Sequence, residues 1–153
     1  MSRPSRATKA AIAAEVWAAL LEVVMGQRNR FLVILSEFDL TPGDLRALSV
    51  LDPEHSRPMG SLAQAWACDA SNVTWMVGRL ETRGLVERRT HPTDRRMRTV
   101  ALTERGAQTK ADLFARLRLP PDDLLTLDRD TLQSLRTNLA KLPASLRSGF
   151  PPG

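Results

Sequence analysis

The sequence is poor in the residues that bind metals and form disulfide bonds. It contains a single cysteine, Cys68, and two histidines, His55 and His91. One cysteine cannot form an internal disulfide bond, and the three side chains lie too far apart in the sequence to suggest a four-ligand zinc site. We therefore expect no metal and no cofactor. A lone thiol also suits a cytoplasmic protein, since the cytoplasm is reducing.

Aromatic residues are also scarce. They make up 5% of the chain, and tyrosine is absent. The core must therefore be built from Leu, Val, Ile, Ala and Met, which suits helices better than a sandwich of β-branched and aromatic strands. A length of 153 residues, with 42% hydrophobic and 25% charged residues, fits one ordinary globular domain. We expect a single, mainly α-helical domain over residues 1–153, and this length excludes a multi-domain enzyme.

Long uninterrupted apolar runs are missing too. An apolar stretch follows Arg3, Arg6 and Lys9, as it would in a secretory signal, but Glu15 and Glu22 interrupt it. No window reaches the roughly 18 uninterrupted apolar residues of a membrane span. No small-residue cleavage pattern follows either. We therefore expect no signal peptide and no membrane contact.

Apolar residues at steps of three and four predict most of the helices. The first helix is long, with Gly26 as a bend. It ends before Thr41, which can cap a second helix running from Pro42 to about Leu51. The apolar face of the first helix comprises Ile12, Val16, Leu20, Val23, Val24, Phe31, Ile34, Leu35 and Phe38.

A helix-turn-helix pattern follows a loop expected at residues 52–58. A short helix is predicted over residues 61–67. After a turn of a few residues, Asp69 can cap the next helix, and Gly84 ends it at a position that favours a left-handed conformation. Two short helices joined in this way form the core of many DNA-binding domains.

The period of the sequence changes after Gly84. Val and Thr alternate weakly over residues 86–90 and 97–102, on either side of the turn-rich residues 91–94. This pattern predicts a β-hairpin. Thr103 can cap the helix that follows it, and that helix is interrupted at residues 119–123.

Five leucines predict a straight apolar seam on a last helix, which residues 150–153 end. Their spacing of three and four residues is typical of a helix that packs along its length. By spacing alone, the seam is either an internal core stripe or a dimer contact. These leucines are Leu132, Leu135, Leu139, Leu142 and Leu146.

Positive charge is concentrated in one third of the chain. The net charge is +5, and residues 71–106 contribute +4 of it, from eight arginines against four acidic residues. Residues 122–130, by contrast, form a patch of net charge −3. A helix after a tight turn fits the major groove of DNA, and an adjoining basic hairpin can reach the phosphates or the minor groove beside it. We therefore predict a winged helix-turn-helix.

At these residues the sequence resembles the MarR family of bacterial transcription regulators. The resemblance covers about 65 residues, and it rests on the order and spacing of the motifs together. It implies a homodimer with interlocking terminal helices, a recognition helix in the major groove and a wing-tip arginine in the minor groove. Many members also lose DNA affinity on binding a small aromatic or anionic compound. The matching motifs are Leu40-Thr41-Pro42, Leu62-Ala63, Ser71-Asn72-Val73-Thr74, Arg79-Leu80-Glu81, Gly84-Leu85-Val86-Glu87-Arg88, Asp94-Arg95-Arg96 and Leu102-Thr103-Glu104-Arg105-Gly106.

The resemblance also implies roles for individual residues. Arg96 is similar to the residue that enters the minor groove, with Arg95 beside it, and Asp94 to the carboxylate that holds the wing tip in shape. Arg79, Arg88 and Arg89 are candidate phosphate contacts. The exposed start of the recognition helix comprises Ala70, Ser71, Asn72, Thr74 and Trp75.

Several of these residues also have a structural interpretation. Any one arginine of the hairpin can be an ordinary solvated side chain. We expect Trp75 to be exposed, because the apolar residues around it already fill the inward face of its helix; the alternative is packing on the neighbouring helix. Some relatives sense peroxide through a cysteine in the first helix, but this chain has none there, so we expect Cys68 to be a buried, inert thiol.

The predicted function is a homodimeric, sequence-specific repressor of transcription that binds palindromic double-stranded DNA. We assign DNA binding to residues 40–106 and dimerisation to residues 7–38 and 107–149. Two-fold symmetry favours the dimer reading of the leucine seam, because one monomer cannot place two recognition helices about 34 to 36 Å apart. The alternative is a winged-helix module that binds an acidic protein. An enzyme fits least, since the sequence has no phosphate-binding loop and no recognisable catalytic set.

Overall fold

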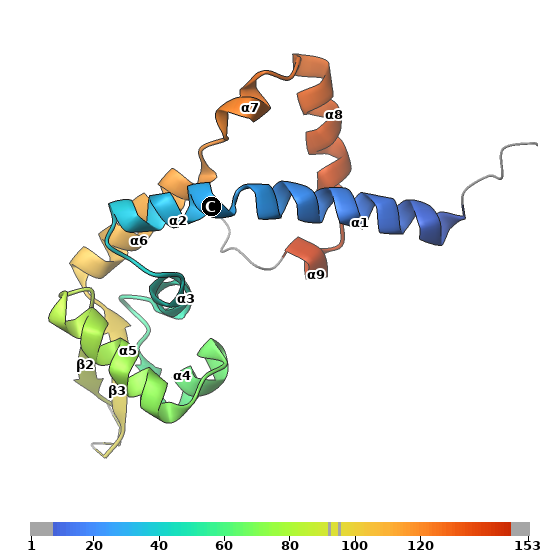
Figure 1. Ribbon diagram of the computed structural model, residues 1–153. Helices are drawn as coiled ribbons and strands as arrows, with labels where there is room; N and C mark the ends of the chain where they lie inside the picture. The colour runs from blue at the N-terminus through green and yellow to red at the C-terminus, as the bar shows by residue number, and fades with distance from the viewer. Residues whose placement is uncertain (1–7, 92, 95, 148–153) are drawn as a thin grey trace, which may run out of the picture.

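The computed structural model describes residues 8–91, 93, 94 and 96–147 (Figure 1). The fold is mainly α-helical with one small antiparallel sheet, as the sequence predicts. In chain order the elements are α1 (Lys9–Gly26), α2 (Arg28–Glu37), α3 (Pro42–Val50), β1 (Arg57–Pro58), α4 (Met59–Trp66), α5 (Ala70–Thr82), β2 (Val86–Thr90), β3 (Arg98–Leu102), α6 (Glu104–Arg118), α7 (Asp122–Leu125), α8 (Arg129–Ala140) and α9 (Ala144–Arg147).

The predicted first helix is present, and it is divided at Gln27 into α1 and α2. Thr8 caps α1, with its hydroxyl oxygen accepting the amide of Ala11 at 3.2 Å. No residue of α1 is buried, whereas Ile34 and Leu35 of α2 enter the core. Figure 1 shows α1 extending away from α3, α4, α5 and the sheet, while α2 lies against α6.

The start of α3 is fixed by a capping box, a reciprocal pair of side-chain to backbone hydrogen bonds. The amide of Asp44 donates to the Thr41 hydroxyl at 3.2 Å, and the amide of Thr41 donates to the Asp44 carboxylate at 2.8 Å. Pro42 occupies the first turn, where a missing N–H leaves no bond unmade. The capping role predicted for Thr41 is confirmed.

Helices α4 and α5 form the predicted helix-turn-helix. Ala67 adopts a left-handed conformation in the turn, with φ of 50°, and Gly84 does so after α5, with φ of 68°. Asp69 occupies the N-cap position of α5 as predicted, but its side chain makes no capping hydrogen bond. The helix α4 begins at Met59, two residues earlier than predicted.

The predicted hairpin is present as β2 and β3, paired from Val86 opposite Leu102 to Thr90 opposite Arg98. A third strand, β1, pairs with the other edge of β3, so the prediction that residues 52–58 are entirely loop is wrong. Two residues are too few to show a strand period, and proline usually argues against a strand. Pro58 fits here because β1 is an edge strand, where a missing N–H costs no ladder bond.

The hydrophobic core lies between α2, α3, α4, α5, α6 and the sheet, a region we call the winged body. Thr103 caps α6 by accepting the Gly106 amide at 2.9 Å, which confirms its predicted role. Gly106 sits against the backbone of Leu85, where a side-chain carbon would collide with the Leu85 carbonyl group. The core residues include Ile34, Leu35, Leu48, Leu51, Leu62, Trp66, Val73, Val77, Leu80, Val86, Val100, Leu102 and Leu113.

The leucine-rich C-terminal region forms two helices, so the prediction of one straight helix is wrong. The helix α8 ends at Ala140, Leu142 lies in the following turn, and α9 begins at Ala144. Pro143 causes the break, because it lacks an amide hydrogen and disfavours helical geometry at the residue before it. The predicted end at residues 150–153 lies outside the described residues.

Candidate DNA-binding surface

The outward face of α5 is polar, while its inward face belongs to the core. Val73, Val77 and Leu80 are buried. Trp75 is 62% exposed, which confirms that it does not pack on the neighbouring helix. The predicted contact residues at the start of the helix are all exposed: Ala70, Ser71, Asn72, Thr74 and Trp75.

The wing tip is organised by Asp94. Its carboxylate accepts the amide of Arg96 at 2.9 Å, and its carbonyl oxygen accepts the amide of Met97 at 3.0 Å. These bonds fit the predicted structural role of Asp94, and they leave the Arg96 side chain exposed. Arg95, predicted beside it, lies outside the described residues.

An open hollow of about 620 Å³ lies between the recognition helix and the wing. It joins Thr74 of α5 to three arginines of the hairpin, which gives it a positive lining. Arg98 is one of them and was not among the predicted contacts. Its place in a strand rather than in the Asp-Arg-Arg motif gave no sign of its position at the site. The lining residues are Met59, Thr74, Arg88, Arg96 and Arg98.

Two of the predicted phosphate contacts have acidic neighbours within the chain. Arg88 lies 3.4 Å from the Glu81 carboxylate, and Arg89 lies 2.7 Å from that of Glu87. Arg89 also donates to the Pro53 carbonyl oxygen at 3.1 Å. The Arg88 and Arg89 side chains are still 36% and 40% exposed, and surface ion pairs of this kind are weak, so both can exchange a carboxylate for a phosphate.

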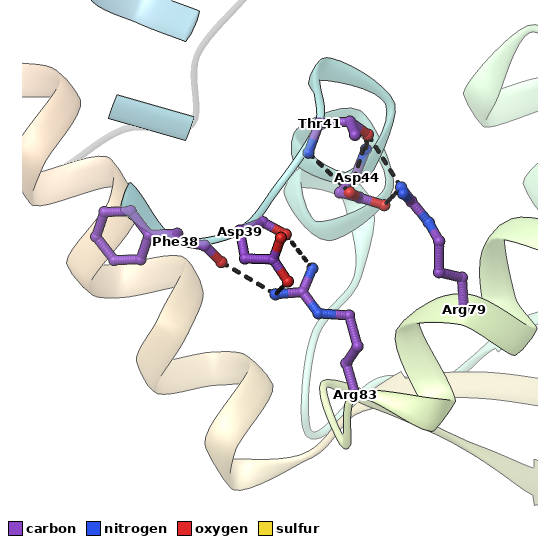
Figure 2. A network of polar contacts seen from close by, with 6 residues as sticks. All are labelled: Phe38, Asp39, Thr41, Asp44, Arg79 and Arg83. Carbon is purple, nitrogen blue, oxygen red and sulfur yellow. Dashed lines mark hydrogen bonds and ion pairs between the residues drawn. The ribbon is translucent and has the colours of Figure 1, made fainter. Parts of the chain in front are cut away.

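Arg79 occupies a different setting, shown in Figure 2. Its guanidinium group forms an ion pair with Asp44, whose side chain is fully buried, and donates to the Thr41 hydroxyl at 3.0 Å. The guanidinium carbon also lies 4.9 Å from the centre of the Trp75 ring. Arg79 therefore joins α5 to α3 and already has a partner for its charge. Spacing along the sequence could not show this tertiary contact.

Arg83 makes the second link in Figure 2, and sequence reasoning did not single it out. Its guanidinium group donates to the carbonyl oxygens of Phe38 and Asp39 and lies 3.3 Å from the Asp39 carboxylate. Asp39 is in a left-handed conformation with φ of 53°, which turns the chain between α2 and α3. Arg79 in the recognition helix and Arg83 at its C-terminal cap thus hold this helix against the α2–α3 corner.

The remaining polar candidates are not gathered into a site. His91 accepts the amide of Thr93 at 3.3 Å within the wing, and Cys68 is half-buried at the turn beside the core. Cys68 is therefore less buried than predicted. Within residues 8–91, 93, 94 and 96–147, no group of three or more His, Cys, Asp or Glu side chains could hold a metal ion.

Comparison with known proteins identifies this architecture. Residues 38–97 match the sequence profile of the MarR family. A protein of Thauera aromatica, named for transcriptional regulation of the hcr operon, is 31% identical over 116 residues, which cover 71% of this chain and 70% of that protein. The chain belongs to the MarR family. It is a transcriptional regulator with the DNA-binding repressor fold of that family, and not an enzyme.

Two solved structures extend the comparison. Wild-type MarR from Escherichia coli is 28% identical, with a TM-score of 0.61 over 82% of this chain and 96% of that one. The transcriptional repressor CouR, solved with a 23-mer DNA duplex, is also 28% identical, with a TM-score of 0.58 over 89% of this chain and 97% of that one. The similarity to both structures extends beyond the winged body into the terminal helices, the name we give to α1, α7, α8 and α9.

Proposed function

We propose that this protein is a homodimeric repressor that binds a palindromic DNA duplex in the cytoplasm. The outward face of α5 enters the major groove, and Arg96 at the wing tip enters the minor groove beside it. The observation that carries this proposal is the hollow where Thr74 of α5 faces Arg88, Arg96 and Arg98 of the hairpin. Cations placed beside a polar helix face suit the phosphates that flank a major groove. The similarity to CouR, solved on DNA, supports it.

We propose that nine residues contact the DNA directly. Residues 40–106 form the DNA-binding part of a single domain spanning residues 1–153. Arg79 differs from the others because its charge is engaged by Asp44, so its contribution comes through the position of α5. The proposed contacts are Ala70, Ser71, Asn72, Thr74, Trp75, Arg88, Arg89, Arg95 and Arg96.

The second copy of the chain in the proposed homodimer is inferred from the apolar surface of the terminal helices. No residue of α1, α7 or α8 is buried in the single chain. These helices nevertheless carry large exposed apolar side chains, and exposed apolar surface of this extent marks an interaction site. We place dimerisation in residues 7–38 and 107–149. The exposed side chains of these helices include Ile12, Val16, Trp17, Leu21, Val23, Val24, Leu125, Leu135 and Leu139, and Leu146 of α9 is exposed as well.

A lipid bilayer is the alternative to a second chain as the partner that covers this apolar surface. The stretch Lys9–Glu37 is long and apolar enough, by length and composition alone, to cross a membrane. However, the apolar part of this stretch is α1, and Glu15 and Glu22 lie within it. A membrane span through α1 would have to bury both carboxylates in lipid. A second copy of the chain need not cover them.

The proposal also includes release of the DNA by a small aromatic or anionic ligand. An apolar hollow of about 490 Å³ lies where α1, α2 and α6 meet, and two arginines lie among its lining residues. Apolar walls with a few placed charges suit an aromatic anion. The walls comprise Val23, Val24, Met25, Gln27, Arg28, Arg30, Phe31 and Leu117.

Selection of bound duplexes from a random pool tests the function. We expect a palindrome whose half-sites are one helical turn apart, bound with an affinity that falls steeply as salt is raised. A set of benzoate-type acids added to that complex then tests release. Recovery of no preferred sequence, or an affinity that does not change with salt, would refute the proposed function.

A further inference from the structure

We propose that Trp75 reads the 5-methyl group of thymine in each half-site, and that the Asp44–Arg79 ion pair holds Trp75 in place for this contact. The inference rests on the proposed function, because it requires α5 to lie in a major groove. It adds a base preference and a positioning device that the fold alone does not specify.

Trp75 is exposed on the surface of α5. Its side chain lies on the outward face of α5 and is 62% exposed, while Val73 and Val77 on the other face supply the core contacts. The winged body therefore does not depend on this indole for packing. A large apolar ring on the surface of a recognition helix is available to the DNA, with most of its area uncovered.

Arg79 lies one helical turn after Trp75 on the same face of α5. Its guanidinium carbon lies 4.9 Å from the centre of the indole ring, which is within the range of a cation–π contact. The contact covers part of the ring and restricts its motion. An aromatic side chain that is ordered before binding loses less entropy when it meets its target.

Arg79 is held in turn by Asp44. Asp44 is fully buried, and its carboxylate also accepts the Thr41 amide at 2.8 Å and the Thr41 hydroxyl at 2.9 Å. Figure 2 shows the guanidinium group of Arg79 directed at this carboxylate. If Arg79 turned to a phosphate, it would leave a buried charge without its partner, which is strongly unfavourable. Arg79 therefore stays in place and keeps Trp75 ordered.

The chemistry of the major groove identifies the target of Trp75. The edges of the bases in the major groove are almost entirely polar, and the exception is the methyl group at C5 of thymine. An indole ring carries one polar N–H and is otherwise apolar, so it gains most from that methyl group. The chemistry on the surface of α5 thus points to thymine at the position that Trp75 faces.

The test uses the full-length protein and the duplex recovered by selection. Each thymine is replaced in turn by deoxyuridine, which lacks only the methyl group, and the Kd values are compared. At one position in each half-site we expect deoxyuridine to weaken binding about four-fold, the factor that burial of one methyl group gives. Trp75→Ala should bind the two duplexes equally, and Trp75→Phe should keep part of the difference.

Two arginine variants separate a loss of Trp75 positioning from a general loss of stability. Arg79→Gln removes the contact with both Asp44 and Trp75, and should bring the thymine to deoxyuridine ratio close to one. Arg83→Gln is the matched control, because Arg83 also ties α5 to the α2–α3 corner but is bonded to Phe38 and Asp39 instead. It should lower stability without changing the ratio. Thermal unfolding of each variant shows which of them are folded at the assay temperature.

The outcomes are distinct. If selection recovers no preferred duplex, the proposed function fails and this inference fails with it. If a preferred duplex is found but deoxyuridine is tolerated at every position, or if Trp75→Ala keeps the difference, only the inference is refuted. If Arg79→Gln folds and retains the wild-type ratio, the role given to the Asp44–Arg79 pair is refuted.

Discussion

The winged body buries its apolar side chains, whereas the terminal helices leave theirs exposed in the single chain. In the winged body, side chains such as Leu48, Leu62 and Val77 are completely buried. In α1 and α7, by contrast, Val23 is 66% exposed and Leu125 is 63% exposed. Because burial of apolar surface drives folding, the winged body has its stabilising contacts within one chain. We propose that the terminal helices obtain theirs from a second chain.

The two regions also differ in how polar groups are used. The winged body is crossed by long-range links that tie α5 to α3 and to the α2–α3 corner, through Arg79 and Arg83. The helix α8 begins with a local cap, in which Asp128 accepts the Thr131 amide three residues away. Long-range bonds fix the recognition surface relative to its core, whereas local caps only start a helix. We propose that the first region presents the DNA-binding surface and that the second determines how many copies of it are held together.

The largest expected effect follows from breaking the seam of α8. Leu135→Glu with Leu139→Glu places two charges on its exposed apolar face, and we expect monomers that bind the selected palindrome about 100- to 10,000-fold more weakly, since the two half-sites are no longer bound jointly. Sedimentation velocity gives the assembly state, and titration of labelled duplex gives the affinity.

The control for this pair is Gln133→Glu with Arg136→Glu, which changes exposed polar positions of the same helix. A dimer that survives the leucine replacements would show that the seam is wrongly placed. Wild-type protein that fractionates with lipid vesicles would show that a membrane covers this surface.

The next largest effect concerns the winged body alone. Gly106→Ala forces a side-chain carbon into the Leu85 carbonyl group, and we expect a loss of about 3 kcal/mol in the free energy of unfolding, at the upper end of what overpacking costs. Gly60→Ala is the matched control, because nothing lies within 4 Å of the added carbon. Denaturant titration measures both variants, and equal stabilities would contradict the packing of α6 on Leu85.

A smaller effect is expected at the wing tip. Arg96→Ala removes an exposed charge without touching the core, so we expect about ten-fold weaker DNA binding and a shallower dependence on salt, by about one phosphate contact. The assembly state and the unfolding midpoint should not change. Arg129→Ala, in the acidic C-terminal patch, is the control. An unchanged Kd for Arg96→Ala would remove the wing from the mechanism.

The smallest expected effect is a pH dependence of the cap at the start of α8. The Thr131 amide and hydroxyl, which donate to Asp128, hold the pKa of that carboxyl below its ordinary value of 3.8. The folded pKa is therefore lower than the unfolded one, so the stabilisation of α8 is present above about pH 4 and is lost as the pH falls through the folded pKa. The protection of the amides of residues 129–132 from exchange, relative to the intrinsic rate at each pH, should fall below pH 4 in the wild type.

The matched variant for this titration is Asp128→Asn. Its amide oxygen can still cap α8, but it does not titrate in this range. We expect the protection of residues 129–132 to change less over the same pH interval. If wild type and variant show the same pH profile, the cap bond is not what stabilises the start of α8.

Local features of the fold were predictable from the sequence because their causes are local. Thr41 and Thr103 cap helices through bonds to residues three positions away, and Gly84 ends α5 where a left-handed residue is favoured. The hairpin was predictable from a change of period over 17 residues, 86–102. The likeness of the motifs to a known family then linked these elements into one arrangement.

The parts that were missed depend on partners far along the chain. Strand β1 is only two residues long and exists because β3 pairs with it. The ion pair between Arg79 and Asp44 joins residues 35 positions apart, so an arginine predicted to bind phosphate is engaged inside the protein. The break at Pro143 is a different case, since the proline was visible but the regular spacing of the leucines outweighed it.

The most direct test of the central claim is the dependence of affinity on half-site spacing. We propose that the terminal helices hold two winged bodies at one fixed separation. Insertion of about five base pairs between the half-sites rotates one of them to the opposite face of the duplex. We expect the affinity then to fall to that of a single half-site. Equal affinity for the two duplexes would contradict it.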